Sequence, residues 1–263
     1  MLPEEKLLDL TKVEMPTTES LPTEDGVPLE SPWHRAEINL LLESIDNHWQ
    51  DRDDYYAGGN MFVYYSSQQV RNREYRGPDF FVVLHVDGTK DRGAWVVWEE
   101  NGRYPDVIIE LLSPSTAEFD KTGKKQLYEQ TFRTPEYYAY DPTTQELMGW
   151  HLRASEYEEI PLDANGRLWS EKLQLWLGLA EGEYAARPGL WLRFFDKDGR
   201  LIPTVGEQEA DRAEQEADRA EQATARAEQA TARAEQEAEA RRAAEAEVAR
   251  LREELARLQD KEE

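Results

Sequence analysis

Two carboxylates lie in apolar segments of the chain, where an ionised side chain is costly to bury. Asp79 opens the apolar run FFVVL after Gly77-Pro78, and Glu110 lies inside VIIELL, residues 107–112. A buried carboxylate requires hydrogen bonds or a cation. If the two segments form adjacent strands, their acids would converge on a hard divalent cation such as Mg²⁺, which prefers oxygen ligands. Asp79 and Glu110 are therefore candidate metal ligands.

A downstream lysine could complete such a site. Asp120, Lys124 and Tyr128 recur every four residues, so they would share one face of a helix, and Lys124 could reach the carboxylates. The residues alone leave an alternative open. Glu110 could instead form a structural ion pair with Lys124 or Lys125 and turn over no substrate, because buried pairs also arise for structural reasons.

Other catalytic motifs are absent from the sequence. It has no Gly-rich phosphate loop, no GxSxG segment and no pair of histidines at metal-binding spacing. Asp106 resembles the two strand acids, but it precedes its strand and is expected to face solvent. Each of the four histidines is expected to be a packing or surface residue rather than a ligand; they are His34, His48, His85 and His151.

Apolar periodicity predicts the elements that must position these residues. Helical spacing predicts a helix over 33–50 and a second over 115–131, capped by Ser115 with Glu118 or by Asp120. The dipeptide Asn101-Gly102 predicts a hairpin between two of the strands. Strands are expected over 60–66, 79–86, 94–99, 107–112, 136–141, 146–152, 157–162, 173–179 and 189–195. The predicted fold is α/β, a mixed sheet flanked by helices.

Composition divides the chain into three parts. Residues 1–30 contain four prolines and no sustained period, which predicts a flexible N-terminal arm with no role in the core. Residues 31–205 form the predicted globular domain. All 8 Trp, 12 Tyr, 7 Phe and 13 Pro precede residue 206, and residues 206–263 have the composition of a helix. We therefore expect a long C-terminal helix or coiled coil.

The C-terminal part is a repeat. Four nearly identical heptads, ADRAEQE, ADRAEQA, TARAEQA and TARAEQE, occupy 210–237 and place small residues along one narrow stripe. A later apolar stripe, which includes Val248 and Leu251, is out of step by three residues. The pattern predicts a coiled coil that joins copies of the chain or recruits a partner. A charged single helix is the alternative, since an alanine stripe buries little area.

The charge balance limits the functions available to the chain. It has 55 acidic and 31 basic side chains, a net charge of −24 and no cysteine. This argues against a basic nucleic-acid clamp, a disulfide scaffold, a cysteine nucleophile and a cysteine-type zinc finger. No apolar run approaches the roughly 18–20 residues that span a bilayer, and the first 30 residues have no targeting pattern. We expect a soluble cytoplasmic protein without membrane partners.

Several segments resemble the Uma family of restriction-endonuclease-like proteins, which is placed in the PD-(D/E)xK nuclease superfamily. The resemblance rests on RGPDFFVV (76–83), WVVWEENG (95–102), ELLSPST (110–116) with Asp120, Lys124 and Tyr128, and YEQTFRTPEYY (128–138). It covers about residues 33–205, and the heptad tail also looks like tails appended to relatives. It implies a restriction-endonuclease-like sheet flanked by helices, and a metal-dependent endonuclease that hydrolyses phosphodiester bonds, with DNA as the expected substrate.

The resemblance also implies roles for single residues. Carried over by position, Asp79 and Glu110 are the ligands of Mg²⁺ or Mn²⁺. The superfamily lysine normally stands two residues after that glutamate, where this chain has Leu112. Lys124 is then the expected substitute, with Lys125 in reserve.

Three further expectations remain. The superfamily's additional acid on the first helix would correspond to Glu30 or Glu37. A local cationic path for a nucleic-acid backbone could come from Arg71, Arg73, Arg76, Lys121, Lys125 and Arg133, although an ordinary solvated surface explains them equally well. The competing hypothesis is a catalytically inactive nuclease fold that acts as a coiled-coil interaction or oligomerisation module, which Leu112 and the acidity of the chain favour.

Overall fold

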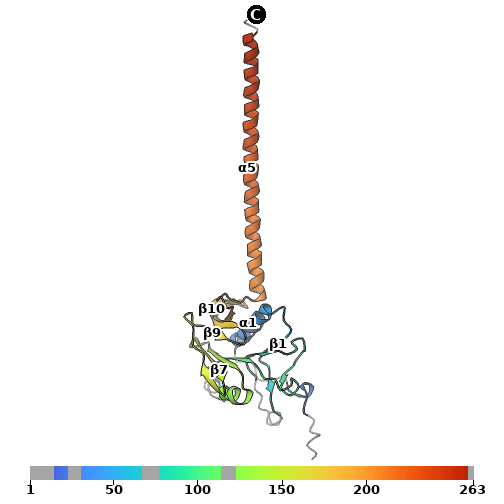
Figure 1. Ribbon diagram of the computed structural model, residues 1–263, viewed down its shortest axis with the longest axis vertical. Coiled ribbons are helices and arrows are strands. Elements are labelled where there is room, and N and C mark those ends of the chain that lie inside the picture. Colours follow the sequence, from blue (N-terminus) through green and yellow to red (C-terminus); the bar gives the residue numbers. More distant parts are fainter. Residues whose placement is uncertain (1–14, 23–30, 67–76, 114–122, 260–263) are drawn as a thin grey trace, which may run out of the picture. The chain divides into compact units, whose positions relative to one another are not determined.

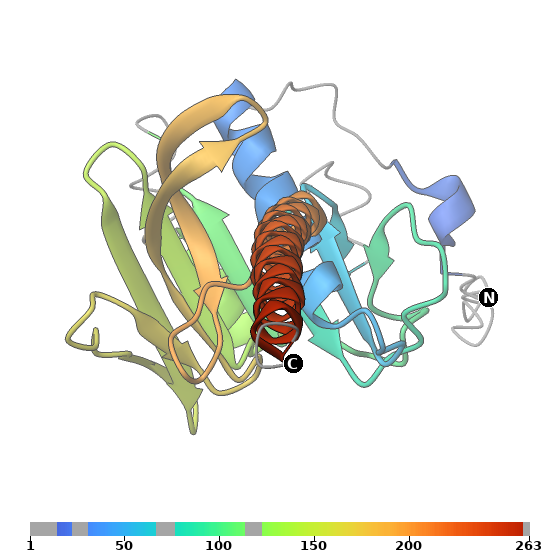
Figure 2. The same ribbon diagram turned by 90° about the horizontal axis from the view of Figure 1, so that it is seen from above.

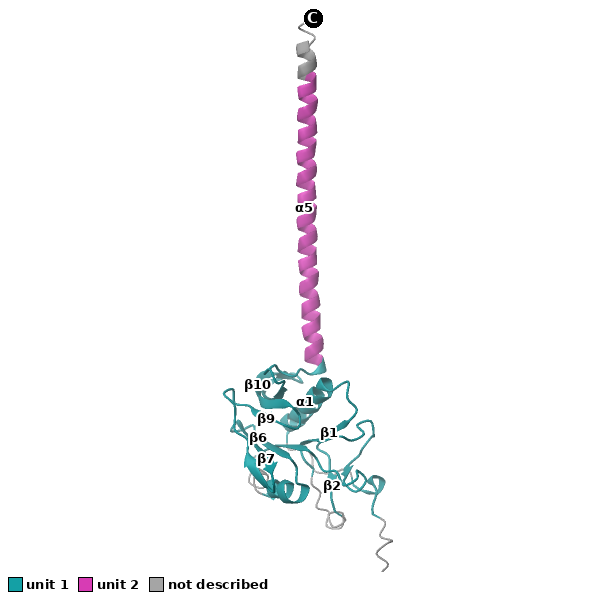
Figure 3. Ribbon diagram, viewed as in Figure 1, with its two compact units in different colours: residues 1–205 teal, residues 206–263 magenta. Residues whose placement is uncertain are grey.

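The computed structural model describes residues 15–22, 31–66, 77–113 and 123–259, and its side chains as far as residue 253. The chain forms two compact units, Met1–Val205 and Gly206–Glu263 (Figure 3). Every strand that the structure describes lies in the first unit, and one helix accounts for the described residues of the second (Figure 1).

A six-stranded sheet is the centre of the first unit. Its strands are β1 (Tyr55–Gly59), β3 (Phe80–Leu84), β5 (Val107–Leu111), β6 (Glu136–Asp141), β7 (Glu146–Arg153) and β8 (Glu156–Glu159), and they lie in that order. Strands β5 and β6 pair in parallel, and every other neighbouring pair is antiparallel. The sheet is therefore mixed, and the predicted mixed α/β class is confirmed.

One face of this sheet is covered by α1 (Pro32–His48) and a three-stranded sheet, β11-β10-β9, as Figure 2 shows. The bounds of these strands are Leu168–Ser170 for β9, Leu175–Tyr184 for β10 and Arg187–Phe195 for β11. Ile38, Leu41 and Ile45 of α1 pack on this face against Phe80 and Ile109. Alternation along the strands produces this face, because Val107, Ile109 and Leu111 share it while the intervening residues point to the other side.

The opposite face is covered by a short helical segment and a two-stranded sheet. The segment contains α4 (Lys125–Leu127) and a turn of π-helix, η4 (Tyr128–Phe132). The small sheet pairs β2 (Val63–Tyr64) with β4 (Trp95–Val96) in parallel. Tyr128, Phe132 and Trp95 pack here against the second set of strand residues, which includes Ile108.

Three details differ from the sequence predictions. Asn101 and Gly102 have the positive φ values of a tight turn, 55° and 76°, but the predicted hairpin is wrong because β4 pairs with β2. The short strands β1 and β9 were not predicted. Asp106 does not face solvent: its Oδ2 accepts a hydrogen bond of 2.8 Å from the Leu84 N–H, and its side chain is only 16% exposed.

The described part of the N-terminal arm also differs from its prediction. Residues 15–22 contain one turn of 3-10 helix, η2 (Thr18–Ser20), and Leu21 is buried in a cluster with Tyr64 and Val96. The hydroxyl of Tyr64 donates to the Pro22 carbonyl at 2.7 Å. This stretch therefore contributes to the core, although the sequence assigned it no such role.

The helix α5 (Val205–Gln259) accounts for the described residues of the second unit and is continuous through the heptads and the change of register. At ~1.5 Å per residue it is about 83 Å long. The apolar side chains of Val248 and Leu251 are 47% and 51% exposed. Ion pairs on its surface include Arg241 with Glu245 at 2.9 Å. No described helix has an apolar stretch long enough to cross a bilayer.

Candidate active site

The register of β3 and β5 brings the two predicted carboxylates together. These strands pair Phe80 with Ile109, and their antiparallel ladder places Asp79 opposite Glu110 at the next position. A hydrogen bond of 2.8 Å from the Leu111 N–H to Asp79 Oδ2 ties the two strand ends. Because residues 79 and 110 alternate with residues of the α1 face, both acids belong to the face covered by α4 and η4.

Glu110 is fully buried and is held by two side chains from the helical segment. Lys124 Nζ donates to Glu110 Oε2 at 2.9 Å, and the Tyr128 hydroxyl donates to Oε1 at 2.6 Å. The Lys124 side chain is 18% exposed, whereas Glu110 is 0% exposed. A buried carboxylate is thus compensated by a charge and a short hydrogen bond, as its desolvation requires.

The helical segment explains how both donors reach one carboxylate. Lys124 and Tyr128 are four residues apart, so they lie on the same side of the helix one turn apart. The turn from Tyr128 onward is π-helical, a form that occurs frequently at functional sites. Arg133 ends it with a left-handed backbone, φ 53°. The shared face predicted for Lys124 and Tyr128 from their spacing is confirmed, and Asp120 lies outside the described residues.

Electrostatics keep Tyr128 protonated. Burial raises the pKa of Tyr128 well above its ordinary value, and the negative charges of Glu110 and Asp79 raise it further. Its phenol is therefore a fixed hydrogen-bond donor and not a proton acceptor.

Sequence reasoning missed His34 at this strand end. The His34 ring is buried; its Nε2 lies 3.0 Å from the Leu111 carbonyl oxygen and its Nδ1 lies 3.0 Å from Ser31 Oγ. A carbonyl only accepts, so Nε2 donates the hydrogen bond to Leu111, while Nδ1 bonds the Ser31 hydroxyl. The backbone of Leu111 is thus held by Asp79 at its N–H and by His34 at its carbonyl. The available signal was Ser31-Pro32, a helix cap that fixes His34 in the first turn.

Other predicted residues are placed elsewhere. Leu112 is fully buried in the apolar cluster around Tyr128. Lys125 Nζ lies over the Trp150 ring, 4.1 Å from its centroid, and burial lowers the pKa of this lysine. Arg133 donates to the Ala154 carbonyl at the surface. The predicted cations Arg71, Arg73, Arg76 and Lys121 lie outside the described residues.

The first-helix acid does not join the two carboxylates. Glu37 is buried on α1 and accepts a hydrogen bond of 3.3 Å from the Leu192 N–H of β11. Burial raises the pKa of Glu37 well above its usual range, while that bond and the charge of Arg193 lower it. Glu37 thus belongs to the packing of α1 on β11, and Glu30 lies outside the described residues.

The two carboxylates fit a magnesium or manganese ion by their chemistry. Among the residues that the structure describes, no group of three His, Cys, Asp or Glu side chains could hold a metal. Mg²⁺ is usually bound through one or two carboxylates, with water and substrate phosphate as its other ligands. A carboxylate has about four acceptor positions, so the bonds to Lys124 and Tyr128 do not by themselves exclude a metal contact at Glu110.

A known family profile matches most of the first unit. The sequence profile of the Uma2 family, described as "Putative restriction endonuclease", matches residues 12–180, well over half of the chain. The chain belongs to the Uma2 family. The matched range contains β3, β5, Lys124 and Tyr128, and it ends within β10.

Among solved structures, this Uma2 chain is similar to one described as "a putative nuclease belonging to DUF820" from Anabaena variabilis. The match has a TM-score of 0.42 and 14% identity, and it covers 60% of this chain and 91% of the other. No curated protein is significantly similar to the chain.

Proposed function

We propose that this Uma2 protein is a metal-dependent endonuclease that hydrolyses phosphodiester bonds in nucleic acid, with DNA as the expected substrate. The observation that carries the proposal is the placement of Asp79 opposite Glu110 with the ammonium of Lys124 only 2.9 Å from Glu110. A purely apolar strand end would need none of these groups. Family membership supports the same reaction class.

Each side chain has a separate task in this proposal. Asp79 and Glu110 would hold Mg²⁺ or Mn²⁺, which supplies electrostatic stabilisation of phosphoryl oxygens and a more acidic water. Lys124 remains partly exposed, so its ammonium can turn toward a phosphate and stabilise charge that develops there. Tyr128 donates to Glu110 and keeps the carboxylate in one orientation. His34 bonds the backbone carbonyl of Leu111, whose N–H donates to Asp79, and would hold this strand end in place.

A cleavage assay tests the proposal. The full chain is incubated with single- and double-stranded DNA and with RNA, with Mg²⁺, with Mn²⁺ or with chelator. We expect metal-dependent cleavage that is lost in Asp79→Asn and Glu110→Gln. Asp106→Asn is the matched control, because Asp106 lies at the other end of β5, bonds a backbone N–H and has no place in the site. Absence of metal-dependent cleavage in the wild type, or equal loss in all three variants, would overturn the proposal.

We further propose that α5 acts as an assembly element for residues 31–205, joining copies of the chain in the cytoplasm. Its support is the exposure of Val248 and Leu251 on an otherwise charged helix. The same observation favours a second candidate function, a nuclease fold that no longer cleaves and serves as an interaction module. The buried Leu112 at the usual lysine position also favours that candidate. The cleavage assay separates the two.

A further inference from the structure

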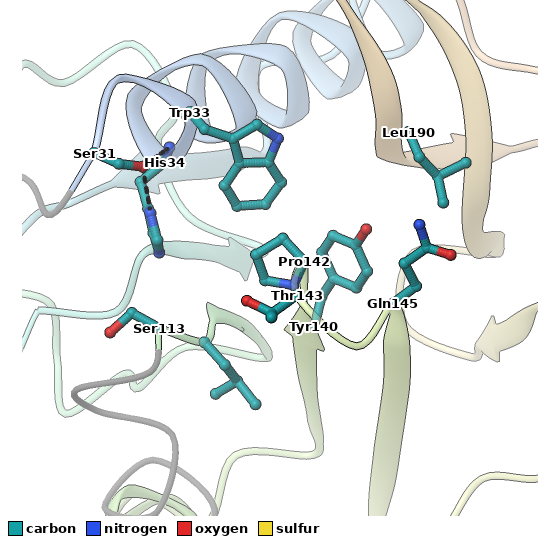
Figure 4. A pocket seen from close by; sticks show the side chains of 10 residues that line it. Ser31, Trp33, His34, Ser113, Tyr140, Pro142, Thr143, Gln145 and Leu190 are labelled. Atoms are coloured by element: carbon teal, nitrogen blue, oxygen red, sulfur yellow. Dashed lines mark hydrogen bonds between the residues drawn. The ribbon is translucent and has the colours of Figure 1, made fainter.

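A pocket of about 770 Å³ lies at the edge of the sheet where β5 and β6 end. Its lining comes from the N-terminal end of α1, the residues after β5, the β6–β7 turn and β11 (Figure 4). Because β5 and β6 are parallel, their carboxyl ends meet at the same edge. The pocket has the volume of an ordinary small-ligand site.

The pocket adjoins the strand end that carries the candidate metal ligands. Leu112 and Ser113, which line it, are the second and third residues after Glu110. At a rise of about 3.3 Å per strand residue, Ser113 lies roughly 10 Å from Glu110 along the chain. Tyr140, another lining residue, is the register partner of Leu111. Glu110 and Tyr140 belong to opposite faces of the sheet. A nucleic-acid strand that passes around this edge could therefore place a phosphate near Glu110 and the neighbouring base near Tyr140.

The chemistry of the lining selects a flat, uncharged ligand. None of the described lining residues is an acid, a lysine or an arginine. The ring of His34 is held at both nitrogens, because Nε2 donates to the Leu111 carbonyl and Nδ1 bonds the Ser31 hydroxyl. At the mouth, Gln145 is exposed and its amide supplies both a donor and an acceptor. Among the lining residues that the structure describes, a phosphate would meet no lysine or arginine, whereas a heteroaromatic ring would meet polar groups for its edge.

An aromatic wall supplies a surface on which such a ring can stack. Trp33 is partly exposed and lies against Trp191, with ring centroids 6.1 Å apart and an interplanar angle of 11°. Tyr140 supports it from another side at 6.0 Å. The indole is therefore held in place before any ligand arrives. Stacking on aromatic side chains is the usual way in which proteins bind unpaired bases.

We propose that this pocket binds one unpaired nucleobase of the substrate strand, next to the phosphodiester held at Asp79 and Glu110. The inference rests on the proposed nuclease function and narrows it: the enzyme would act on single-stranded nucleic acid, or on a duplex from which one base is turned out. Trp33 is the stacking residue, and Gln145 contacts the edge of the base.

Fluorescence of a base analogue tests the pocket directly. The full chain carrying Glu110→Gln, which is expected to bind without cleaving, is titrated with single-stranded oligonucleotides that contain one 2-aminopurine at successive positions. We expect quenching at one position, where the base stacks on Trp33. An abasic site at that position should weaken binding about 5- to 150-fold, the range measured for loss of one aromatic–base stack. This comparison changes only the oligonucleotide, so it does not depend on how a protein variant folds.

A pair of tryptophan variants supplies the matched control. Trp33→Leu should abolish the quenching and weaken binding by the same factor, and it should have no further effect on the abasic oligonucleotide. Trp176 is also partly exposed but lies away from this pocket. Trp176→Leu should therefore change neither the quenching nor the binding of the oligonucleotide. Equal behaviour of the two variants, or quenching at no position, would overturn the inference.

Cleavage by the wild-type chain separates this inference from the proposed function. Metal-dependent cleavage that is unaffected by an abasic site at any position would overturn the proposed base binding but would still support the nuclease function. No cleavage with Mg²⁺ or Mn²⁺ would overturn the nuclease. Quenching that depends on Trp33 would in that case still support the base site, as a binding function without hydrolysis.

Discussion

Replacing Tyr128 by Phe removes the phenol that donates to Glu110 Oε1 at 2.6 Å and leaves the ring in place. Both residues are 0% exposed, so no water is at hand to replace the lost donor. Hydrogen bonds to charged groups contribute about 1.5–3 kcal/mol. We therefore expect Tyr128→Phe to lower the free energy of unfolding by about 1.5–3 kcal/mol.

Urea titration followed by tryptophan fluorescence measures the unfolding of the first compact unit, which contains Tyr128. All 8 tryptophans precede residue 206, so the signal reports on the first unit and not on α5. With a urea m-value of about 3 kcal/mol/M for a large domain, the midpoint should fall by about 0.5–1 M. Tyr157→Phe is the control: its hydroxyl donates to the neutral Thr134 carbonyl at 2.9 Å, so its loss should cost only about 0.5–1.5 kcal/mol.

A double-mutant cycle decides whether the bond to Glu110 is the cause. In a Glu110→Gln background the acceptor is no longer charged, so Tyr128→Phe should cost about as little as Tyr157→Phe does. The stabilising role of the Tyr128–Glu110 hydrogen bond is refuted if Tyr128→Phe lowers the free energy of unfolding no more than Tyr157→Phe does in the wild type. This role is also refuted if Tyr128→Phe lowers the free energy of unfolding equally in the wild type and in Glu110→Gln, since ring packing alone would then explain the loss.

Three other predictions concern the site, the core and the tail. Lys124→Met should slow metal-dependent cleavage by about 100- to 1000-fold, as loss of one electrostatic donor does, whereas Lys125→Met should change the rate little because Lys125 lies over a tryptophan ring. Glu37→Gln should gain stability relative to the wild type as the pH is raised from 4 to 8 in urea titrations. The folded-state pKa of Glu37 is raised above 4.5, so the stability that this carboxyl contributes is present below pH 4.5 and is lost as the pH rises through its folded pKa. A difference in unfolding free energy between Glu37→Gln and the wild type that stays constant over this pH range would contradict the raised pKa. If α5 joins copies of the chain, sedimentation of the full chain should give the mass of an oligomer. The double variant Val248→Asp, Leu251→Asp should then give the mass of a monomer. Equal masses for the wild type and the double variant would contradict the assembly role.

The sequence by itself determined the local elements and the residue types of the site. Runs of apolar, aromatic and β-branched residues located β3, β5 and β6, which are buried on both faces of the sheet, and helical or heptad spacing located α1 and α5. An acid inside VIIELL was already anomalous, and the spacing of Lys124 and Tyr128 already placed them on one helical face. Chain composition likewise separated the tail, because heptads without Gly or Pro have no other stable local structure.

Only the tertiary structure decided which segments meet. Asn101-Gly102 formed the expected turn, but the strand before it paired with β2 because pairing depends on the packing of distant segments and not on the turn alone. His34 looked like an ordinary histidine until the fold brought α1 against the end of β5 and its ring to the Leu111 carbonyl, 77 residues away in the chain. Likewise, Asp106 and Glu110 have similar neighbours in the sequence. The register of β3 separates them, because it places Asp106 against a backbone N–H at one strand end and Glu110 against Asp79 at the other.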